Sequence, residues 1–373
     1  MKNICFVNSY ACLGGAEKSL QSLIVGFRNK GYHITAVVGE DGPLCEWLYN
    51  EKIEHCIIPQ PSLKSGIGKY LSPVNLLKFL LSVRHFLKKN NVDIVHVNTF
   101  RSRLYCSYLK KIYKCKLIAH VRDIEPSSFN EFLISKYDYT IAISKAVEEC
   151  LLKDIKYSPE IVRKIKVIYN GVEETELTLA QKASNNIVQI AMFSRYDEWK
   201  CQHVLIEAIK LIRENNEHLL ENVVFKLYGA PIRKAEVDYY AKIVSLVEKY
   251  GLKNHVIFMG FCCEPLQQMR QMDLIVCPSD NEPFGRVVIE AMSLKKVVFA
   301  SGNGGIIEIL GQNFGELTFR PRDPDSLSRL LINYVENKKQ FDGEYKDKLY
   351  EEYKSRFSIE QLINNIEKLY REE

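Results

Sequence analysis

Residues 279–292 read Ser279-Asp280-Asn281-Glu282-Pro283-Phe284-Gly285-Arg286-Val287-Val288-Ile289-Glu290-Ala291-Met292. A short apolar run at 274–277 precedes this stretch and predicts a buried strand, and an apolar segment at 287–294 predicts a helix. Of the two carboxylates, Glu282 lies in the turn and Glu290 about one turn into the helix. A strand, a polar turn and a helix in this order are typical of an open α/β sheet, which binds ligands at the carboxyl ends of its strands.

The two carboxylates are open to two interpretations. Glu290 is surrounded by apolar residues, and a buried acid rarely lacks a partner. The simplest partner is Arg286 at i,i+4, or the helix N-terminus itself. Alternatively, both acids face a ligand, because a carboxylate accepts hydrogen bonds from the paired hydroxyls of a ribose or a hexose. Spacing alone does not decide between them.

The same alternation of strands and helices extends in both directions and predicts parallel sheets. The expected strands of the first half are 4–8, 34–38, 55–58, 94–98, 116–121, 139–143 and 166–168, and the helices are 16–30, 73–89, 102–112 and 145–154. The second half is expected to contain strands 187–193, 223–228, 256–259, 274–277 and 297–300, with helices 202–213 and 234–250 and a last helix from Ser358 to Tyr370. Because 373 residues exceed one ordinary core, we expect an α/β protein of two doubly wound domains, 1–172 and 187–355, with a polar linker at 173–186 and a ligand cleft between them.

The composition is that of a soluble globular protein, with 46% hydrophobic and 26% charged residues. No apolar run is long enough to span a membrane, and residues 1–7 read as a strand rather than a signal peptide. The eleven cysteines contain no C-x-x-C pair. They therefore indicate reduced thiols in a cytoplasm rather than a disulfide or zinc framework.

Charge is distributed unevenly along the chain. Residues 1–172 hold 25 Lys and Arg against 15 Asp and Glu, and the stretches 55–92 and 94–122 contain no acid. Such a field attracts a membrane surface, a nucleic acid or a phosphorylated substrate. A merely solvated basic face is the alternative.

Two cations follow the first strand of the second half. Lys200 lies at the expected start of a helix, where it opposes the helix dipole, and Arg195 precedes it. Both become favourable if a diphosphate binds at that helix end. Pairing with Asp197 or Glu198 would also explain them.

Two glycine-rich turns also lead from a strand into a helix, Gly14-Gly15 and Gly302-Asn303-Gly304-Gly305. Glycine lets the backbone approach a ligand closely, although loop flexibility alone would account for either turn. Neither the dinucleotide fingerprint nor the P-loop motif occurs. His96 and His120 each fall near the end of an expected strand, where either a structural or a substrate-contacting role is open, and no metal-site spacing surrounds them.

Together these motifs resemble the retaining glycosyltransferases of family 4, which have the GT-B fold. The most specific part is Glu282-Pro283-Phe284-Gly285 through Glu290, which matches the E-x7-E signature of the family. The resemblance covers nearly the whole chain, and its supporting matches are Gly14-Gly15-Ala16-Glu17, Asp93-Ile94-Val95-His96, His120, Ile143-Ser144-Lys145-Ala146, Ile168-Tyr169-Asn170-Gly171-Val172, Ser194-Arg195 with Lys200, and Gly304-Gly305-Ile306 with Glu308. It implies two Rossmann-like domains, with residues 356–373 forming a helix that crosses back onto the first domain.

The resemblance also implies roles for individual residues. Arg195 and Lys200 would hold the donor diphosphate, and Glu290 would bind the ribose. Glu282 and the backbone N–H groups of Phe284 and Gly285 would hold the transferred sugar. The remaining assignments concern the first domain: Gly14 and Gly15 would border the phosphates, His120 would approach sugar and acceptor, and His96, His120 and Arg122 would contact the acceptor.

Two positions depart from the family pattern. Cys201 follows Lys200 where a glycine is usual, which leaves close backbone approach there in question. Ser301-Gly302-Asn303 replaces a more usual polar or acidic lead-in to the glycine pair, with a consequence for donor choice.

The implied activity is transfer of a hexose from a nucleoside-diphosphate sugar, expected to be UDP-linked, to a glycan acceptor, expected to be lipid-linked, in cell-surface polysaccharide biosynthesis. No metal or other cofactor and no nucleic acid is expected. The helix at 73–89 interleaves Leu and Phe with Lys and Arg, which suits an anionic membrane at the inner face of the plasma membrane or simple packing on the sheet. The competing functions are a nucleotide-sugar epimerase of the same fold and a non-catalytic nucleotide-sugar binder; an oxidoreductase would need the missing fingerprint.

Overall fold

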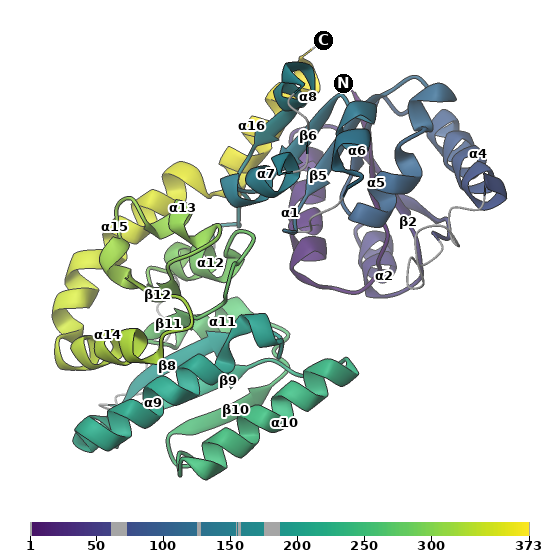
Figure 1. Ribbon diagram of the computed structural model, residues 1–373. Helices are drawn as coiled ribbons and strands as arrows, with labels where there is room; N and C mark the ends of the chain where they lie inside the picture. The colour runs from purple at the N-terminus through teal and green to yellow at the C-terminus, as the bar shows by residue number, and fades with distance from the viewer. Residues whose placement is uncertain are drawn as a thin grey trace. The chain divides into compact units, whose positions relative to one another are not determined.

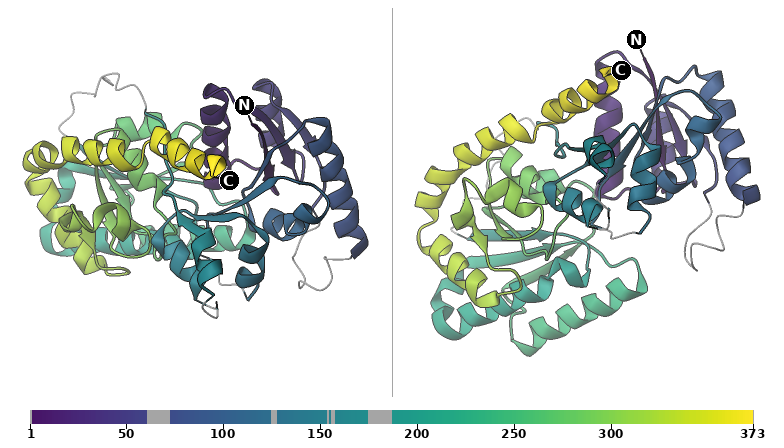
Figure 2. Two further views of the ribbon diagram at one scale, coloured as in Figure 1. Left: turned by 90° about the horizontal axis from the view of Figure 1, so that it is seen from above. Right: turned by 45° about the horizontal axis from the view of Figure 1, so that its top comes forward.

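The computed structural model describes residues 2–60, 73–124, 128–153, 155, 158–174 and 187–372. The chain forms two compact units, one of Met1–Gly171 with Ile359–Glu373 and one of Val172–Ser358 (Figures 1 and 2). Most of the expected linker at 173–186 lies outside the described residues.

The first unit is built on a parallel sheet of seven strands in the order β3-β2-β1-β4-β5-β6-β7. Its strands are β1 Asn3–Asn8, β2 His33–Val38, β3 Glu54–Ile57, β4 Ile94–Val97, β5 Lys116–Val121, β6 Tyr139–Ala142 and β7 Ile165–Val167. The chain runs from β1 outward to β3 and then returns to place β4 on the other side of β1. The sheet therefore has a topological switch point between β1 and β4.

Helices cover both faces of this sheet. They are α1 Gly15–Asn29, α2 Pro43–Asn50, α4 Pro73–Lys89, α5 Phe100–Cys106, η1 Leu109–Lys111, α6 Asn130–Lys136, α7 Lys145–Leu152 and α8 Pro159–Lys164. The last helix of the chain, α16 Ile359–Arg371, packs beside α1 (Figure 1). The two helices approach closely because α1 has no side chain at Gly26, where a Cβ would lie 2.7 Å from Ile363 Cδ1.

The second unit contains a parallel sheet of six strands in the order β10-β9-β8-β11-β12-β13. Its strands are β8 Val188–Phe193, β9 Val223–Tyr228, β10 Val256–Gly260, β11 Leu274–Cys277, β12 Val297–Ser301 and β13 Thr318–Phe319. Its helices are η2 Glu198–Lys200, α9 Gln202–Asn216, η3 Glu217–Asn222, α10 Lys234–Lys249, α11 Pro265–Arg270, α12 Arg286–Ser293, α13 Ile306–Leu310, η4 Gly315–Leu317, α14 Pro324–Glu336 and α15 Lys338–Arg356. The switch point lies between β8 and β11.

The predicted fold class, two doubly wound α/β domains, is confirmed. The last helix belongs to the first unit, as the resemblance implied. The main local difference lies at 102–112, where the structure has the short helix α5 and the 3₁₀ turn η1 instead of one helix. Asp154, the expected end of the helix at 145–154, lies outside the described residues. Among the helices that the structure describes, none is both long and apolar enough to cross a membrane.

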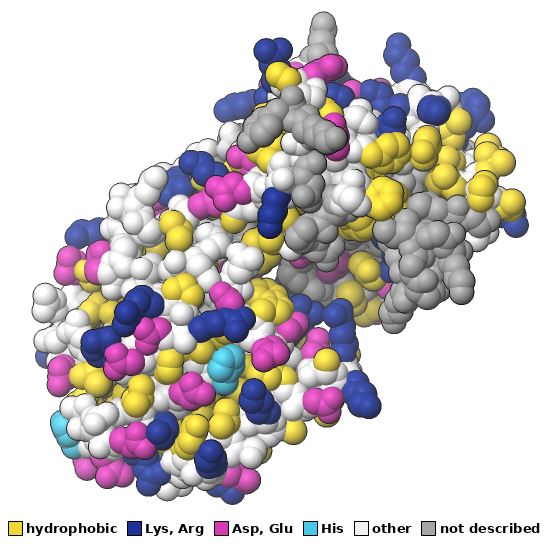
Figure 3. Space-filling view, in the orientation of Figure 1, with side chains coloured by type: hydrophobic (Ala, Val, Ile, Leu, Met, Phe, Trp, Pro, Cys, Tyr) yellow, Lys and Arg dark blue, Asp and Glu magenta, His cyan; other side chains and the backbone are white. Residues whose placement is uncertain are grey.

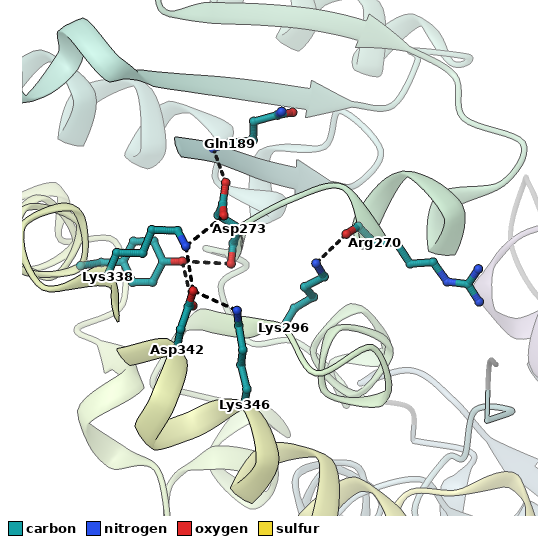
Figure 4. A network of polar contacts seen from close by, with 8 residues as sticks. Gln189, Arg270, Asp273, Lys296, Lys338, Asp342 and Lys346 are labelled. Atoms are coloured by element: carbon teal, nitrogen blue, oxygen red, sulfur yellow. Dashed lines mark hydrogen bonds and ion pairs between the residues drawn. The ribbon is translucent and has the colours of Figure 1, made fainter. Parts of the chain in front are cut away.

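A network of charges fastens the first turns of α15 to the amino-terminal ends of two strands, β8 and β11, in the second sheet (Figure 4). Asp273, just before β11, accepts from the backbone N–H of Gln189 at 2.8 Å and pairs with Lys338 at 3.1 Å. Lys338 also contacts Asp342 at 2.7 Å, and Asp342 contacts Lys346 at 2.9 Å. Burial alone would lower the pKa of Lys338, but the two carboxylates outweigh it and raise the pKa. The network therefore lies at the amino-terminal ends of the strands, on the other side of the sheet from their carboxyl ends.

We expect Asp273→Ala to lower the unfolding free energy of the second unit by about 3 kcal/mol, because it removes a buried acceptor and leaves a half-buried lysine with one partner fewer. Urea unfolding followed by Trp199 fluorescence in a Trp47→Phe background measures this. Asp347→Ala is the matched control: its carboxylate pairs with Lys295 at the surface, so the change is expected to stay within about 0.5 kcal/mol. Equal effects of the two substitutions would contradict the prediction.

Candidate functional site

In the second unit, the loops that follow β8 and β11 meet across the switch point. Lys200, at the end of the β8 loop, places its Nζ 2.7 Å from Glu282 Oε2 in the β11 loop. Both side chains are largely buried, at 15% and 13% exposure. The ammonium also lies over the Trp199 ring, 3.9 Å from its centre. Two residues 82 positions apart, each predicted to bind the donor, are thus direct partners.

The turn that carries Glu282 is held in place by the glycine-rich turn after β12. A Cβ on Gly304 would lie 2.5 Å from the Glu282 carbonyl oxygen, and φ at Gly304 is +55°. A Cβ on Gly305 would lie 2.6 Å from Phe284 Cα, and its N–H donates to the Glu282 carbonyl at 2.8 Å. This glycine pair is therefore explained by backbone packing against the Glu282 turn, so neither a ligand nor loop flexibility is needed to account for it.

Glu290 has the partner that spacing suggested. Its Oε1 accepts from Arg286 Nε at 2.7 Å, an i,i+4 pair on the first turns of α12. The carboxylate is buried within its helix surroundings, with 10% of the side chain exposed. Gly285, just before α12, has φ of +109°, which glycine adopts without strain. The structure places Glu290 one helix turn behind the Glu282 loop and satisfies it without a ligand.

Cys201 takes the backbone conformation that a glycine at this position would favour. Its φ and ψ are 57° and 40°, in the left-handed region, and its side chain is buried. The chain thus keeps the sharp entry from η2 into α9 despite the substitution. Burial raises the pKa of the Cys201 thiol, so the group stays protonated near neutral pH. The departure from the family pattern changes the side chain and leaves the turn intact.

Arg195 pairs with a residue that sequence reasoning missed. Its guanidinium lies 3.8 Å from Glu236 on α10, rather than beside Asp197 or Glu198, and half of the Arg195 side chain is exposed. Burial by itself would raise the pKa of Glu236, but the N–H groups of Ile232 and Arg233 and the two nearby guanidinium groups outweigh it and lower the pKa. The only local signal for Glu236 is its position in the first turn of α10.

A second missed cluster joins four loops at the same end of the sheet, those after β8, β11, β12 and β13. Asp280 donates its N–H to the Trp199 carbonyl at 2.7 Å. Its carboxylate accepts from Asn303 at 2.6 Å and from Arg322 at 2.5 Å. Asp280 thereby ties the Lys200 loop to the glycine-rich turn, and Asn303 of the unusual lead-in has a structural contact.

In the first unit, Gly14 and Gly15 begin α1 at the carboxyl end of β1. The Gly14 N–H donates to Glu17 Oε2 at 3.1 Å, so one donor of the helix start is already occupied. Asn8, the last residue of β1, lies 3.4 Å from the other Glu17 oxygen. A Cβ on Gly15 would meet nothing within 4 Å. Open space therefore lies beside Gly15, as a ligand-bordering position requires.

His96, His120 and Arg122 come together on β4 and at the end of β5. His96 Nε2 lies 3.1 Å from His120 Nδ1, and Arg122 donates to the same nitrogen at 3.3 Å. The Arg122 fork also reaches Asn98 at 2.7 Å and Asn170 at 2.8 Å. Burial lowers the pKa of His96 to about 3 and that of His120 well below its ordinary value, with the Arg122 charge adding to both. Both imidazoles are therefore neutral near pH 7.

His96 differs from the sequence expectation in one respect. It lies within β4, is fully buried, and has hydrogen-bond partners on both ring nitrogens, His120 and Tyr370. His96 therefore lies behind His120 and has no free ring nitrogen with which to contact the acceptor substrate. Tyr370 could not be found by local pattern because it lies 274 residues further along the chain.

Two family models match the chain. Glycosyltransferase family 4 matches residues 13–176, and glycosyl transferases group 1 matches residues 178–356. An uncharacterized glycosyltransferase of Methanocaldococcus jannaschii is 24% identical over 97% of this chain and 96% of its own. The capsular polysaccharide biosynthesis glycosyltransferase CapH of Staphylococcus aureus is 23% identical over 86% of this chain and 88% of its own.

Solved structures show the same fold at low identity. HepE of Anabaena, solved in complex with UDP and glucose, superposes with a TM-score of 0.80 at 22% identity over the whole of both chains. A glycosyltransferase of Rickettsia africae gives a TM-score of 0.83 at 20% identity, over 100% of this chain and 98% of its own.

We expect Gly304→Ala to lower the unfolding free energy of the second unit by about 2–4 kcal/mol, because the methyl group meets the Glu282 carbonyl and the left-handed backbone becomes strained. Urea unfolding followed by Trp199 fluorescence, with Trp47 replaced by Phe, measures the loss. Gly315→Ala is the control, since a Cβ there meets nothing within 4 Å. If Gly304→Ala were as stable as Gly315→Ala, the close packing of the two turns would be wrong.

Proposed function

Because the chain belongs to the GT-B glycosyltransferases that these two family models describe, we propose that it transfers a hexose from a UDP-linked sugar to a lipid-linked glycan acceptor, with retention at the anomeric carbon. The observation that carries the proposal is the contact of Lys200 with Glu282 across the β8/β11 switch point. A cation suited to a diphosphate and a carboxylate suited to sugar hydroxyls lie side by side where a sheet of this kind binds ligands.

The diphosphate is assigned to Lys200 and Arg195. Lys200 supplies a point charge that is held over Trp199, and Arg195 is half exposed and offers its fork to an anion. In the absence of donor, Lys200 and Glu282 neutralise each other. Donor binding would replace this ion pair with an ion pair between the phosphate and Lys200 and with hydrogen bonds from sugar hydroxyls to Glu282. We propose that these cations make a metal ion or other cofactor unnecessary for leaving-group stabilisation.

The sugar and the ribose are assigned to separate acids. Glu282 and the backbone N–H groups of Phe284 and Gly285, next to the N-terminus of α12, would hold the transferred hexose. Glu290 would accept from the ribose while Arg286 remains on its Oε1. In the first unit, Gly14 and Gly15 would border the phosphates, and His120 and Arg122 would contact sugar and acceptor.

Retention follows if acceptor and leaving group share one face of an oxocarbenium-like transition state. The acceptor O–H bond breaks as the new glycosidic bond forms, and its proton passes to the departing diphosphate oxygen. No protein base is then required. Catalysis comes from positioning and from charge stabilisation by Lys200 and Arg195.

Two relatives support the choice of donor and pathway. HepE of Anabaena has been solved with UDP-glucose, and CapH of Staphylococcus aureus serves capsular polysaccharide biosynthesis. We propose by analogy a UDP-sugar donor and a role in cell-surface polysaccharide biosynthesis at the cytoplasmic face of the membrane. Stabilisation against heat by UDP, and not by NAD, separates this function from an oxidoreductase. Release of UDP only when acceptor is added separates it from an epimerase or a non-catalytic binder.

A membrane-facing role for α4 is supported by the way its side chains divide. Its inward side chains, Phe79, Leu80, Val83, Phe86 and Leu87, pack into the core, as the simpler interpretation required. Val74, Leu77 and Leu81, at i, i+3 and i+7, are instead 59%, 56% and 50% exposed. Leu81 and Ile57 of β3 line one shallow hollow, and exposed Lys78 and Lys88 lie on the same helix. Figure 3 shows apolar side chains gathered over the α4 region with basic groups near them. An apolar stripe beside lysines suits an anionic lipid surface.

We expect Lys200→Ala to lower turnover about 100-fold or more, because it removes a charge that stabilises the leaving diphosphate. The measurement is UDP release from a panel of UDP-sugars with lipid-linked acceptors, beside circular dichroism as a check of folding. Lys210→Ala on α9 is the control, since that lysine pairs with Glu214 on the exposed side of the helix. Undiminished turnover in Lys200→Ala would refute the assignment, and so would wild-type transfer by Glu282→Ala.

We expect the protein to float with vesicles that contain phosphatidylglycerol, and the double variant Leu77→Glu, Leu81→Glu to bind them roughly tenfold less, because two exposed apolar groups are lost and two negative charges added. Ile232→Glu with Val237→Glu is the control pair, placed on exposed apolar residues of the second unit. Equal loss in both pairs, or no binding by the wild type at low salt, would remove α4 from this role.

A further inference from the structure

Tyr370, on the last helix α16, places its hydroxyl group within hydrogen-bonding distance of the buried histidine pair of the first unit. Tyr370 Oη lies 2.6 Å from His96 Nδ1, and His96 Nε2 lies 3.1 Å from His120 Nδ1. Tyr370, His96 and His120 are at most 1% exposed. A continuous series of hydrogen bonds, which we call the relay, thus runs from Tyr370 on α16 through His96 on β4 to His120 near the end of β5.

The direction of these bonds follows from two donors, the Tyr370 hydroxyl and the Arg122 guanidinium. The Tyr370 hydroxyl is buried, and within the described part of the chain its one acceptor is His96 Nδ1, so it donates there. His96 must then carry its proton on Nε2 and donate to His120 Nδ1. Arg122, which has no lone pair to offer, also donates to that nitrogen. Both contacts require His120 Nδ1 to accept and place the proton of His120 on Nε2.

His120 Nε2 is the last atom of the relay, and it has no hydrogen-bond partner among the described residues. A buried donor of this kind is rare in folded proteins and marks a place for a water or a ligand oxygen. Both imidazoles are neutral, because burial and the Arg122 charge hold the pKa of each below its ordinary value. The group is therefore a fixed N–H donor and not a titrating base.

We propose that Tyr370 is a positioning residue, which acts through His96 to hold His120 in the tautomer that presents Nε2–H to an oxygen of the sugar or the acceptor. The identity of that ligand rests on the proposed function; the relay itself does not. His120 touches the ligand, whereas Tyr370 and His96 act through it.

The surroundings of Tyr370 hold its hydroxyl in one place. Its ring packs against Phe27 with centres 4.8 Å apart and against Tyr32 at 6.5 Å. One turn earlier, Glu367 binds Lys30 at 2.6 Å and the Tyr32 hydroxyl at 2.9 Å. These contacts fasten α16 to α1 and leave the Tyr370 ring little freedom. Removal of the hydroxyl alone should therefore change the relay and spare the packing.

The test is ¹⁵N NMR of the imidazole nitrogens in histidine-labelled protein without ligand, with His120 assigned by its loss in His120→Gln. The wild type is expected to show His120 as the Nε2–H tautomer. Tyr370→Phe is expected to give a mixture of tautomers at His120, because only one of the two groups that favour the Nε2–H form, Arg122, then remains. Tyr32→Phe is the matched control: it removes a hydroxyl from the same helix interface but not from the relay, and His120 should be unchanged.

Kinetics provide the second readout. Tyr370→Phe is expected to lower kcat about fivefold with little change in the KM for donor, as loss of one positioned hydrogen bond would. Tyr32→Phe should keep the wild-type kcat even where its thermal stability falls equally. A His120 signature that is the same in both variants would overturn the relay. If the wild type is an active transferase but Tyr370→Phe leaves the His120 tautomer unchanged, the relay is wrong and the function stands. If Tyr370→Phe changes the tautomer but the wild type shows no transferase activity, the function is wrong and the relay stands.

A second pair of variants acts one step along, should Tyr370→Phe not fold. His96→Gln retains an amide N–H that can donate to His120 Nδ1, whereas His96→Phe retains only a ring, which can pack against Phe6. The relay predicts the Nε2–H tautomer of His120 in the Gln variant and a mixture in the Phe variant. Identical signatures in the two would overturn it.

Discussion

The close contact between two backbone turns underlies the candidate donor site. Gly304 and Gly305 lie so near the Glu282 turn that no side chain fits between them. The Glu282 carboxylate can meet Lys200 only if its own turn is placed by this contact and by the Asp280 bond to the Trp199 carbonyl. The rigid backbone turns hold the Lys200–Glu282 ion pair in place, and a site needs such support if it is to keep its geometry without a ligand.

The charges of that site are satisfied before any donor binds. Lys200 has Glu282, Glu290 has Arg286, and Arg195 has Glu236. An unpaired charge at these positions would destabilise the unit, so the pairs permit polar residues to be kept at a partly buried surface. A sugar nucleotide offers both an anion and hydroxyl groups. Under the proposed assignments, its phosphate would take the place of Glu282 on Lys200 and its sugar hydroxyls the place of Lys200 on Glu282, while Arg286 stays on Glu290. Both replacements must occur together, which favours a ligand that carries both groups.

The sequence predicted what depends on neighbours along the chain. The strand, turn and helix around 279–292 and the Glu290–Arg286 spacing are local, and period and composition sufficed for them. The entry into α9 needed a left-handed residue, and the structure has one although the glycine cue is absent at Cys201. Asp280, Glu236 and Tyr370 were missed because each acts on a residue of another loop or helix, and no local pattern records which distant loops a sheet brings together. His96 was expected near a strand end and is the last residue but one of β4; the strand pattern could not show that its ring is buried between His120 and Tyr370.

The two switch points use different chemistry, and this difference has a physical reason. The one between β8 and β11 is charged, which suits the diphosphate of the proposed donor. Beyond the β1/β4 switch point, the polar centre of the first unit is a pair of neutral imidazoles. Arg122, which can only donate, and the Tyr370 hydroxyl, which donates to His96, place their protons. A neutral N–H recognises an uncharged hydroxyl without the cost of desolvating a charge. The closing helix of the chain is thus more than a cover for the first sheet: its Tyr370 hydroxyl, together with Arg122, fixes which nitrogen of the buried His120 carries the proton.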